Sequence, residues 1–125
     1  MIFIYNLKNK PMGLDTSHDA WHGPYSSFNQ FRHKIAEAIG VNLDSFEGYG
    51  GNVPFDELKR GVRWLLDHSD CDGHITPKRC KLIADDLKKI IPLLEDGVWS
   101  PKSQAIKFMK GCLKAYKKNE KLDFH

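Results

Sequence analysis

Apolar side chains recur every three to four residues in four stretches of this chain, a spacing that places them on one face of a helix. The third stretch has the most regular stripe, formed by Cys80, Ile83, Ala84, Leu87, Ile90, Ile91 and Leu94. A β-prone run at residues 2–5 precedes all four and is compatible with either a short N-terminal β element or an N-terminal arm packed on the core. The pattern predicts a mainly α, four-helix single domain over residues 1–125, with helices near 27–39, 54–67, 77–91 and 101–119.

Residues that start or stop helices lie beside these stretches. Thr76 and Ser100 each precede a proline, which combines a capping side chain with a residue suited to the first helical position. Ser27 has the spacing of a capping box, and Gly40 predicts the end of the first helix. Gly61 lies inside the second stretch, where it either weakens the helix or marks a close crossing with another element.

The central loop, residues 67–76, joins the second and third expected helices and resembles an EF-hand loop. With Gly73 at position 6, Asp70 falls at position 3 and Asp72 at position 5. The match fails at two strong ligands, because His68 is at position 1 and Arg79 is at position 12. The sequence therefore favours a turn followed by a helix cap, in an EF-hand-like helix-loop-helix that binds calcium weakly or not at all.

A second polar stretch, residues 15–22, contains two histidines four positions apart. If Ser17 caps one helical turn, His18 and His22 share a face, and two imidazoles at this spacing can ligate zinc. In the simpler interpretation, which the sequence favours, the polar side chains hydrogen-bond the loop around a buried Trp21.

A metal site would need the two polar loops to meet in space. Its candidate ligands are His18, His22, Asp70, Asp72 and His74, with Cys71 as a further possibility, and its candidate metals are calcium and zinc. The primary expectation is that the protein has no cofactor. The 15–25 region also concentrates polar and aromatic residues for which helix packing has no use, so we assign interaction roles to Asp15, Trp21 and Tyr25.

Composition places few limits on function. Hydrophobic residues make up 41% of the chain and charged residues 28%, as in ordinary globular proteins. No apolar run approaches the ~20 residues of a membrane span, and the N-terminal apolar run is too short for a signal peptide. Three cysteines are an odd number, which favours a reducing compartment and a cytoplasmic location.

The last expected helix carries lysines around its outer faces: Lys107, Lys110, Lys114, Lys117, Lys118 and Lys121. Such a surface is compatible with nucleic acid or an acidic partner. However, it has no arginine for bidentate base contacts and no interleaved aromatic residues. The net charge of +3 is also mild. A solvated helix face is therefore the favoured interpretation, with nucleic-acid binding as an alternative.

Two stretches are considered together: Ser17-His18-Asp19-Ala20-Trp21-His22-Gly23-Pro24-Tyr25-Ser26-Ser27-Phe28-Asn29-Gln30-Phe31-Arg32 and Ser69-Asp70-Cys71-Asp72-Gly73. They resemble a group of short bacterial and phage proteins of unknown function. The resemblance covers residues 13–95 and leaves the lysine-rich helix outside. It implies a bacterial or phage cytoplasmic setting. It implies no activity, because the group has none established.

Three functions remain open. A small accessory or protein-interaction protein, with another protein as its partner, requires no special chemistry and is favoured. The alternatives are a metal-binding protein or metal-dependent hydrolase that uses loops 15–22 and 67–76, and nucleic-acid binding through the last helix. Covalent catalysis is disfavoured, because Cys71 lies in an acidic loop and Ser17 beside His18 is adjacency rather than triad geometry. The sequence thus favours a non-enzyme without a membrane partner.

Overall fold

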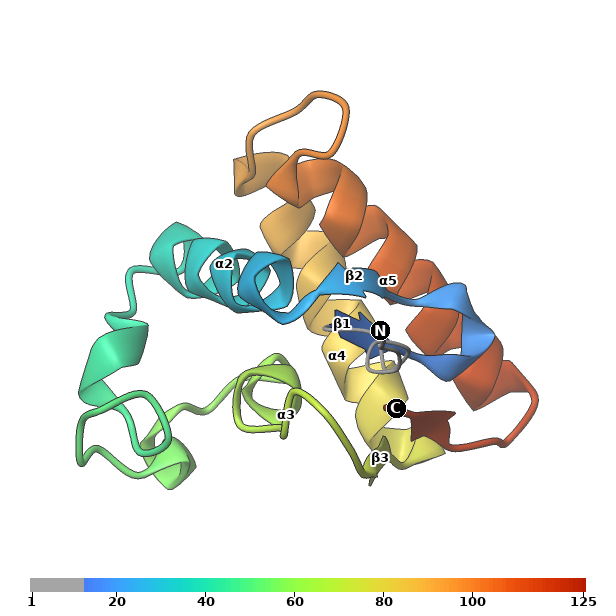
Figure 1. Cartoon of the computed structure of the whole chain (residues 1–125), viewed down its shortest axis with the longest axis horizontal. Coiled ribbons are helices and arrows are strands. Elements are labelled where there is room, and N and C mark those ends of the chain that lie inside the picture. The colour runs from blue at the N-terminus through green and yellow to red at the C-terminus, as the bar shows by residue number, and fades with distance from the viewer. Residues whose placement is uncertain (1–12) are drawn as a thin grey trace, which may run out of the picture.

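The computed structural model describes residues 13–125, so the β element or N-terminal arm considered for residues 2–5 lies outside the described chain. The fold is mainly α, as predicted. Its helices are α2 (Tyr25–Ala38), α3 (Arg63–Leu66), α4 (Pro77–Ile90) and α5 (Pro101–Lys117), and 3-10 turns occur at Ser17–Asp19, Leu43–Ser45, Phe55–Glu57 and Ile91–Leu93. Helices α4 and α5 lie side by side and α2 runs across them (Figure 1). No helix within residues 13–125 is long and apolar enough to cross a membrane.

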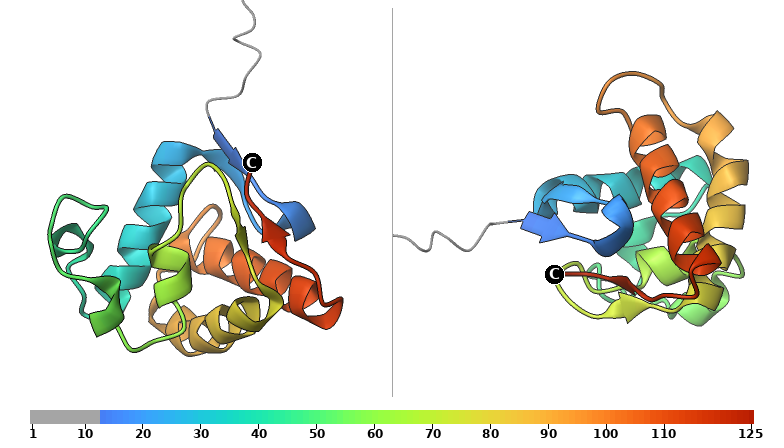
Figure 2. Two further views of the ribbon diagram at one scale, coloured as in Figure 1. Left: turned by 90° about the horizontal axis from the view of Figure 1, so that it is seen from below. Right: turned by 90° about the vertical axis from the view of Figure 1, so that its right-hand side faces the viewer.

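Four short extended segments lie beside one another near the end of the helix pair. Strand β1 (Gly13–Asp15) pairs with β2 (His22–Pro24), and β3 (His74–Ile75) pairs with β4 (Leu122–Asp123), both antiparallel. A bridge between Thr16 and Phe124 connects the two pairs. Residues 122–125, the C-terminal segment, therefore lie between β1 and β3 (Figure 2, left).

Local signals place most helix ends correctly. The Thr76 hydroxyl accepts a hydrogen bond from Arg79 N–H at 3.3 Å, and the Ser100 hydroxyl accepts one from Ser103 N–H at 3.1 Å. Gly40 adopts the left-handed conformation just beyond α2, with φ of 74°. Only the capping box at Ser27 is wrong, because α2 begins two residues earlier and follows Pro24, which has no capping side chain.

The second expected helix, 54–67, is not continuous. The structure has a 3-10 turn at Phe55–Glu57 and then only the four-residue helix α3. Between them the chain approaches α4 so closely that a Cβ on Gly61 would lie 2.1 Å from the Leu82 carbonyl oxygen. Of the two roles considered for Gly61, close crossing is confirmed, and this crossing interrupts the helical pattern.

An aromatic cluster fills the space between α2, α5 and the 15–22 loop. Trp21 is 5% exposed. Its ring stacks on that of Phe31, with 5.2 Å between the ring centres, and meets that of Phe28 edge-on, with 5.1 Å between the centres. Phe108 of α5 approaches both phenylalanines. A buried Trp21, as the simpler interpretation required, therefore connects the 15–22 loop to the hydrophobic core.

Candidate functional site

The two polar loops meet at one pocket, and the C-terminal segment lies between them. The pocket has a volume of about 690 Å³ and is here called the loop pocket. Its lining comes from both loops and from the C-terminus: Gly13, Leu14, Asp15, His22, Gly23, Pro24, Tyr25, Cys71, Asp72, Phe124 and His125. Segments separated by about fifty and a hundred residues in sequence thus share one concave surface.

Backbone pairing aligns three titratable side chains along the loop pocket. Asp15 is the register partner of His22, and its N–H and C=O each bond to the backbone of His125 at 2.8 Å. On the other side of the C-terminal segment, Phe124 N–H donates to the Gly73 carbonyl. Directly paired residues point to the same face of a sheet, which gives the row His22, Asp15, His125. Asp72 joins the lining of the pocket from the bend before Gly73, whose backbone is left-handed with φ of 87°.

The rest of the loop pocket is mostly apolar. Leu14 and Phe124 are buried with 1% and 4% exposure and form part of its wall, beside Pro24 and the half-buried Tyr25. Nδ1 of His22 lies 3.4 Å from an oxygen of Asp15, and both side chains are exposed to solvent. A surface with apolar walls and a few polar groups that can fix orientation is typical of a binding site.

His18 lies elsewhere, and the expectation that it shares a helix face with His22 is wrong. The 3-10 turn ends at Asp19, His22 belongs to β2, and His18 has a left-handed backbone with φ of 59°. Its Nδ1 lies 2.8 Å from Ser17 Oγ and its Nε2 lies 2.8 Å from Glu120 Oε1. Because Ser17 Oγ also accepts the N–H of Asp123, this series of contacts connects the 15–22 loop to the C-terminal region.

The central loop closes around its own histidine. Nδ1 of the His68 ring lies 2.8 Å from the Ser69 carbonyl oxygen, and Nε2 lies 3.0 Å from the His74 carbonyl oxygen. The ring also packs on that of Phe124, with 4.1 Å between the ring centres. Nη1 of the buried Arg32 donates to the His68 carbonyl at 2.6 Å. Side-chain and backbone contacts of His68 therefore fix the conformation of the central loop.

The candidate metal ligands divide between several places. His22 and Asp72 line the loop pocket, whereas Asp70 lies beside Arg32 and Tyr49 in a different pocket and His74 is exposed on β3. Within residues 13–125, no three His, Cys, Asp or Glu side chains lie close enough together to hold a metal ion. Of the three residues assigned to interaction, Asp15 and Tyr25 line the loop pocket and Trp21 is in the core.

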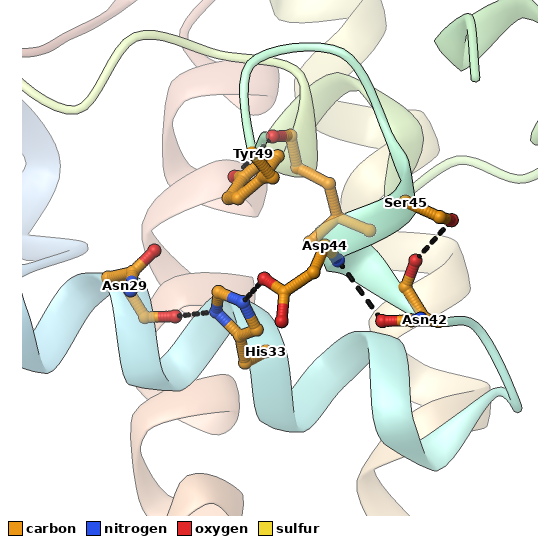
Figure 3. A network of polar contacts seen from close by, with 7 residues as sticks. Asn29, His33, Asn42, Asp44, Ser45 and Tyr49 are labelled. Atoms are coloured by element: carbon orange, nitrogen blue, oxygen red, sulfur yellow. Dashed lines mark hydrogen bonds and ion pairs between the residues drawn. The ribbon is translucent and has the colours of Figure 1, made fainter. Parts of the chain in front are cut away.

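A third group of polar contacts holds the loop after α2 (Figure 3). The ring of His33 lies 2.8 Å from Asp44 Oδ1 and 2.8 Å from the Asn29 carbonyl. Burial lowers the pKa of His33, but these two hydrogen bonds outweigh it and raise the pKa above its ordinary value. The Tyr49 hydroxyl donates to the Leu66 carbonyl at 2.6 Å, and burial raises its pKa to about 12. These contacts hold the glycine-rich 48–51 turn against α3.

Two residues of the loop pocket, Phe124 and His125, were missed from the sequence. The available signal was the alternation of apolar and polar residues in Leu122-Asp123-Phe124-His125, which is the pattern of a half-buried strand. No protein-family model, curated protein or solved structure matches this chain. The function therefore has to be argued from the geometry of the site.

Proposed function

We propose that this chain is a small protein-interaction protein that holds a segment of its partner in the loop pocket. The observation that carries the proposal is the convergence of the 15–22 loop, the central loop and the C-terminal segment on one apolar-walled pocket. Nothing in the packing of the core requires Asp15, His22 and Asp72 to lie there with exposed side chains. The resemblance noted in the sequence supports an accessory role in a bacterial or phage cytoplasm.

The chemistry of the pocket indicates the kind of segment it would hold. The half-buried Tyr25, beside Pro24, offers aromatic surface to an apolar side chain. Asp15 and Asp72 contribute two carboxylates to the lining of the pocket, whereas the overall charge of the protein is +3. A partner segment with an apolar residue next to a lysine or arginine fits both features, because the local acidic groups attract a cation that the rest of the molecule repels.

Selection from a random peptide library displayed on phage tests this proposal. The wild-type protein should enrich peptides that combine an aromatic or large aliphatic residue with a basic one. The double variant Asp15→Asn, Asp72→Asn should lose this enrichment while keeping its melting temperature, because both residues are exposed. The matched control is Asp85→Asn, an exposed aspartate of α4 outside the pocket. Equal enrichment by wild type and double variant would contradict the proposal.

Zinc binding in the loop pocket is the second candidate. The observation that favours it is the presence of two imidazoles and two carboxylates in the lining of the pocket, which are donor types that zinc uses. Because no three donors in the described chain are already grouped, binding would require their side chains to rotate toward one another. Calorimetric titration with zinc tests it, and Asp15→Asn and His22→Ala should each abolish the heat of binding if it is correct.

Nucleic-acid binding through α5 has weaker support. Nζ of Lys107 lies 3.5 Å from an oxygen of Asp19, which partly neutralises one end of the lysine-rich face. Binding to the remaining lysines would be electrostatic, so its affinity would fall steeply between low and physiological salt. A titration of labelled duplex DNA at two salt concentrations distinguishes this mode from the loop pocket.

A further inference from the structure

The loop that joins α4 to α5 carries an exposed apolar surface. It extends past the ends of both helices (Figure 1 and Figure 2, right). Val98 is 86% exposed, Trp99 is 84% exposed, and Leu93 at the start of the loop is also exposed. Large apolar side chains that gather on a surface mark a contact with another molecule, so this loop is a candidate interaction surface.

The backbone holds Trp99 in an unfavourable conformation. Its φ of 61° lies in the left-handed region, which bulky residues rarely adopt. The next residue, Ser100, is buried and caps α5 by accepting the N–H of Ser103 at 3.1 Å. The start of α5 therefore fixes a strained turn that leaves the indole in solvent, and strain of this kind is concentrated at functional sites.

A pocket beside this indole lies between α2 and the start of α5. It has a volume of about 750 Å³ and is here called the α2–α5 hollow. Pockets of this size accommodate a drug-sized molecule, so the hollow has ample room for one indole. Trp99 lines its edge, and the rest of the lining includes Asn29, Gln30, Lys34, Glu95, Pro101 and Gln104. An apolar protrusion and a hollow that can receive one therefore lie on the same face.

We propose that a second copy of this chain covers this face, in a two-fold symmetric dimer in which the indole of Trp99 of each copy enters the α2–α5 hollow of the other. A two-fold interface uses one patch on both copies, so that patch must be complementary to itself. The shape of this face meets the requirement, and so do its charges. Lys34 on α2 and Glu95 on the loop are both exposed on the lining of the hollow, so each can pair with the other residue across the axis.

The size of the contact predicts a weak dimer. An aromatic side chain buries about 150–250 Å², so two indoles and the hollow surfaces they cover account for about 600–1,000 Å², which is less than a standard interface buries. We therefore expect a dissociation constant on the order of 10–100 µM. This inference does not depend on the proposed function, because the α2–α5 hollow and the loop pocket share no residue.

Sedimentation equilibrium of the full chain tests the proposal. Between about 5 and 500 µM, a range that brackets the expected dissociation constant, the wild-type protein should change from monomer to dimer. Trp99→Asn should weaken association at least about tenfold, as truncation of a buried interface tryptophan does, and asparagine tolerates the left-handed backbone. The matched control is Tyr116→Gln, which removes an exposed aromatic side chain of α5 outside the hollow and should leave the dissociation constant unchanged.

Charge reversal tests the two-fold arrangement. Lys34→Glu and Glu95→Lys should each weaken self-association about three- to tenfold, because each places like charges opposite one another across the axis. An equimolar mixture of the two variants should associate as strongly as the wild type, because every contact then again joins a lysine to a glutamate. Three results would overturn the proposal: a monomer at every concentration, an unchanged dissociation constant in Trp99→Asn, or no recovery of association in the mixture.

Discussion

The carboxylate of Asp86 on α4 accepts a hydrogen bond from the backbone N–H of Val62 at 3.1 Å. Asp86 is 8% exposed and also receives two hydrogen bonds from the guanidinium of Arg60, at 3.1 and 2.7 Å. One buried side chain of a neighbouring helix therefore satisfies the N–H just before α3. This long-range capping supports the start of α3 at Arg63, after the close crossing of Gly61 with α4 has interrupted the helical pattern.

Replacing Asp86 by alanine should destabilise the protein by about 2–3 kcal/mol, because a buried N–H and a partly buried guanidinium lose a charged acceptor. Urea unfolding measures the change. Asp85→Ala is the matched control, since Asp85 is exposed and only pairs with Lys81 on the helix surface, a contact worth about 0.3–0.5 kcal/mol. Similar losses in both variants would contradict the capping role.

The contribution of Asp86 should also depend on pH. Burial raises the pKa of Asp86, but the hydrogen bonds from Arg60 and Val62 outweigh it and hold the pKa below the ordinary value. Because the pKa of Asp86 is lower in the folded state, its ionised carboxylate stabilises the protein at pH values above the unfolded-state pKa of about 3.9. This stabilisation disappears as the pH falls through the folded-state pKa. The difference in stability between wild type and Asp86→Asn should therefore be constant near neutral pH and shrink below about pH 4.

Periodicity predicted α2, α4 and α5 to within a few residues because each of these helices buries one stripe of its own residues. It failed over 54–67, where the apolar residues are buried by a 3-10 turn and a short helix on either side of the Gly61 crossing. The contacts that decide this, Asp86 to Val62 and Gly61 to Leu82, join residues more than twenty positions apart. A local pattern contains no information about them.

The candidate site shows the same limit. Polar and aromatic residues at 15–25 and 67–76 indicated where it could form, and five of the proposed residues do line one pocket: Asp15, His22, Tyr25, Cys71 and Asp72. The sequence could not show that the C-terminal segment lies between the two loops, because pairing of Asp15 with His125 spans almost the whole described chain. Nor did helical spacing apply to His18 and His22, since β2 begins at His22.

Gly111 should not tolerate even alanine. It lies in α5 against the 15–22 loop, and a Cβ there would be 2.5 Å from the Cβ of Ala20 and 2.8 Å from its Cα. Alanine favours a helix over glycine by about 1 kcal/mol, but overpacking of this kind costs about 1–3 kcal/mol. We expect Gly111→Ala to lower stability in thermal unfolding, whereas Lys110→Ala, on the exposed side of the same turn, should change it little. A stabilised Gly111→Ala would show that the loop does not pack tightly on α5.

The contact between His33 and Asp44 should stabilise the protein more in mild acid than in mild base. Both ring nitrogens of His33 face acceptors, an arrangement that only the protonated ring satisfies as a double donor. The pKa of His33 is raised in the folded state. The stabilisation is therefore complete at pH values below the unfolded-state pKa of about 6.5 and is lost as the pH rises through the folded-state pKa. Asp44→Asn should therefore cost about 0.5 kcal/mol near pH 5.5 and close to nothing near pH 8.5, the size expected for an exposed pair.

The control for this pH effect is Asp56→Asn. Asp56 pairs with Arg63 at 3.1 Å, and arginine does not titrate in this range. The stability lost in Asp56→Asn should be the same at both pH values. Chemical denaturation of the two variants and the wild type at each pH gives the comparison, and an equal pH dependence for both variants would exclude His33 as its source.

Calcium should stabilise the protein only slightly. His68 and Arg79 replace two strong ligands of an EF-hand loop, the His68 ring extends across the loop, and the Arg79 guanidinium lies 3.7 Å from the ring centre of Trp64. A dissociation constant of about 1 mM, as in the weakest calcium modules, gives about 0.4 kcal/mol at roughly 1 mM calcium. The melting temperature would then rise by ~1–3 °C.

Thermal melts of EDTA-treated protein with and without calcium distinguish this outcome from a functional EF-hand. A micromolar site would add about 4 kcal/mol at the same calcium concentration, a shift of order ten degrees. Thr76→Ala should cost about 1 kcal/mol whether or not calcium is present, because its hydroxyl caps α4 by accepting the N–H of Arg79. A large calcium-dependent rise that disappears in Asp70→Ala or Asp72→Ala would instead show that the loop binds the ion, and that the His68 ring moves out to admit it.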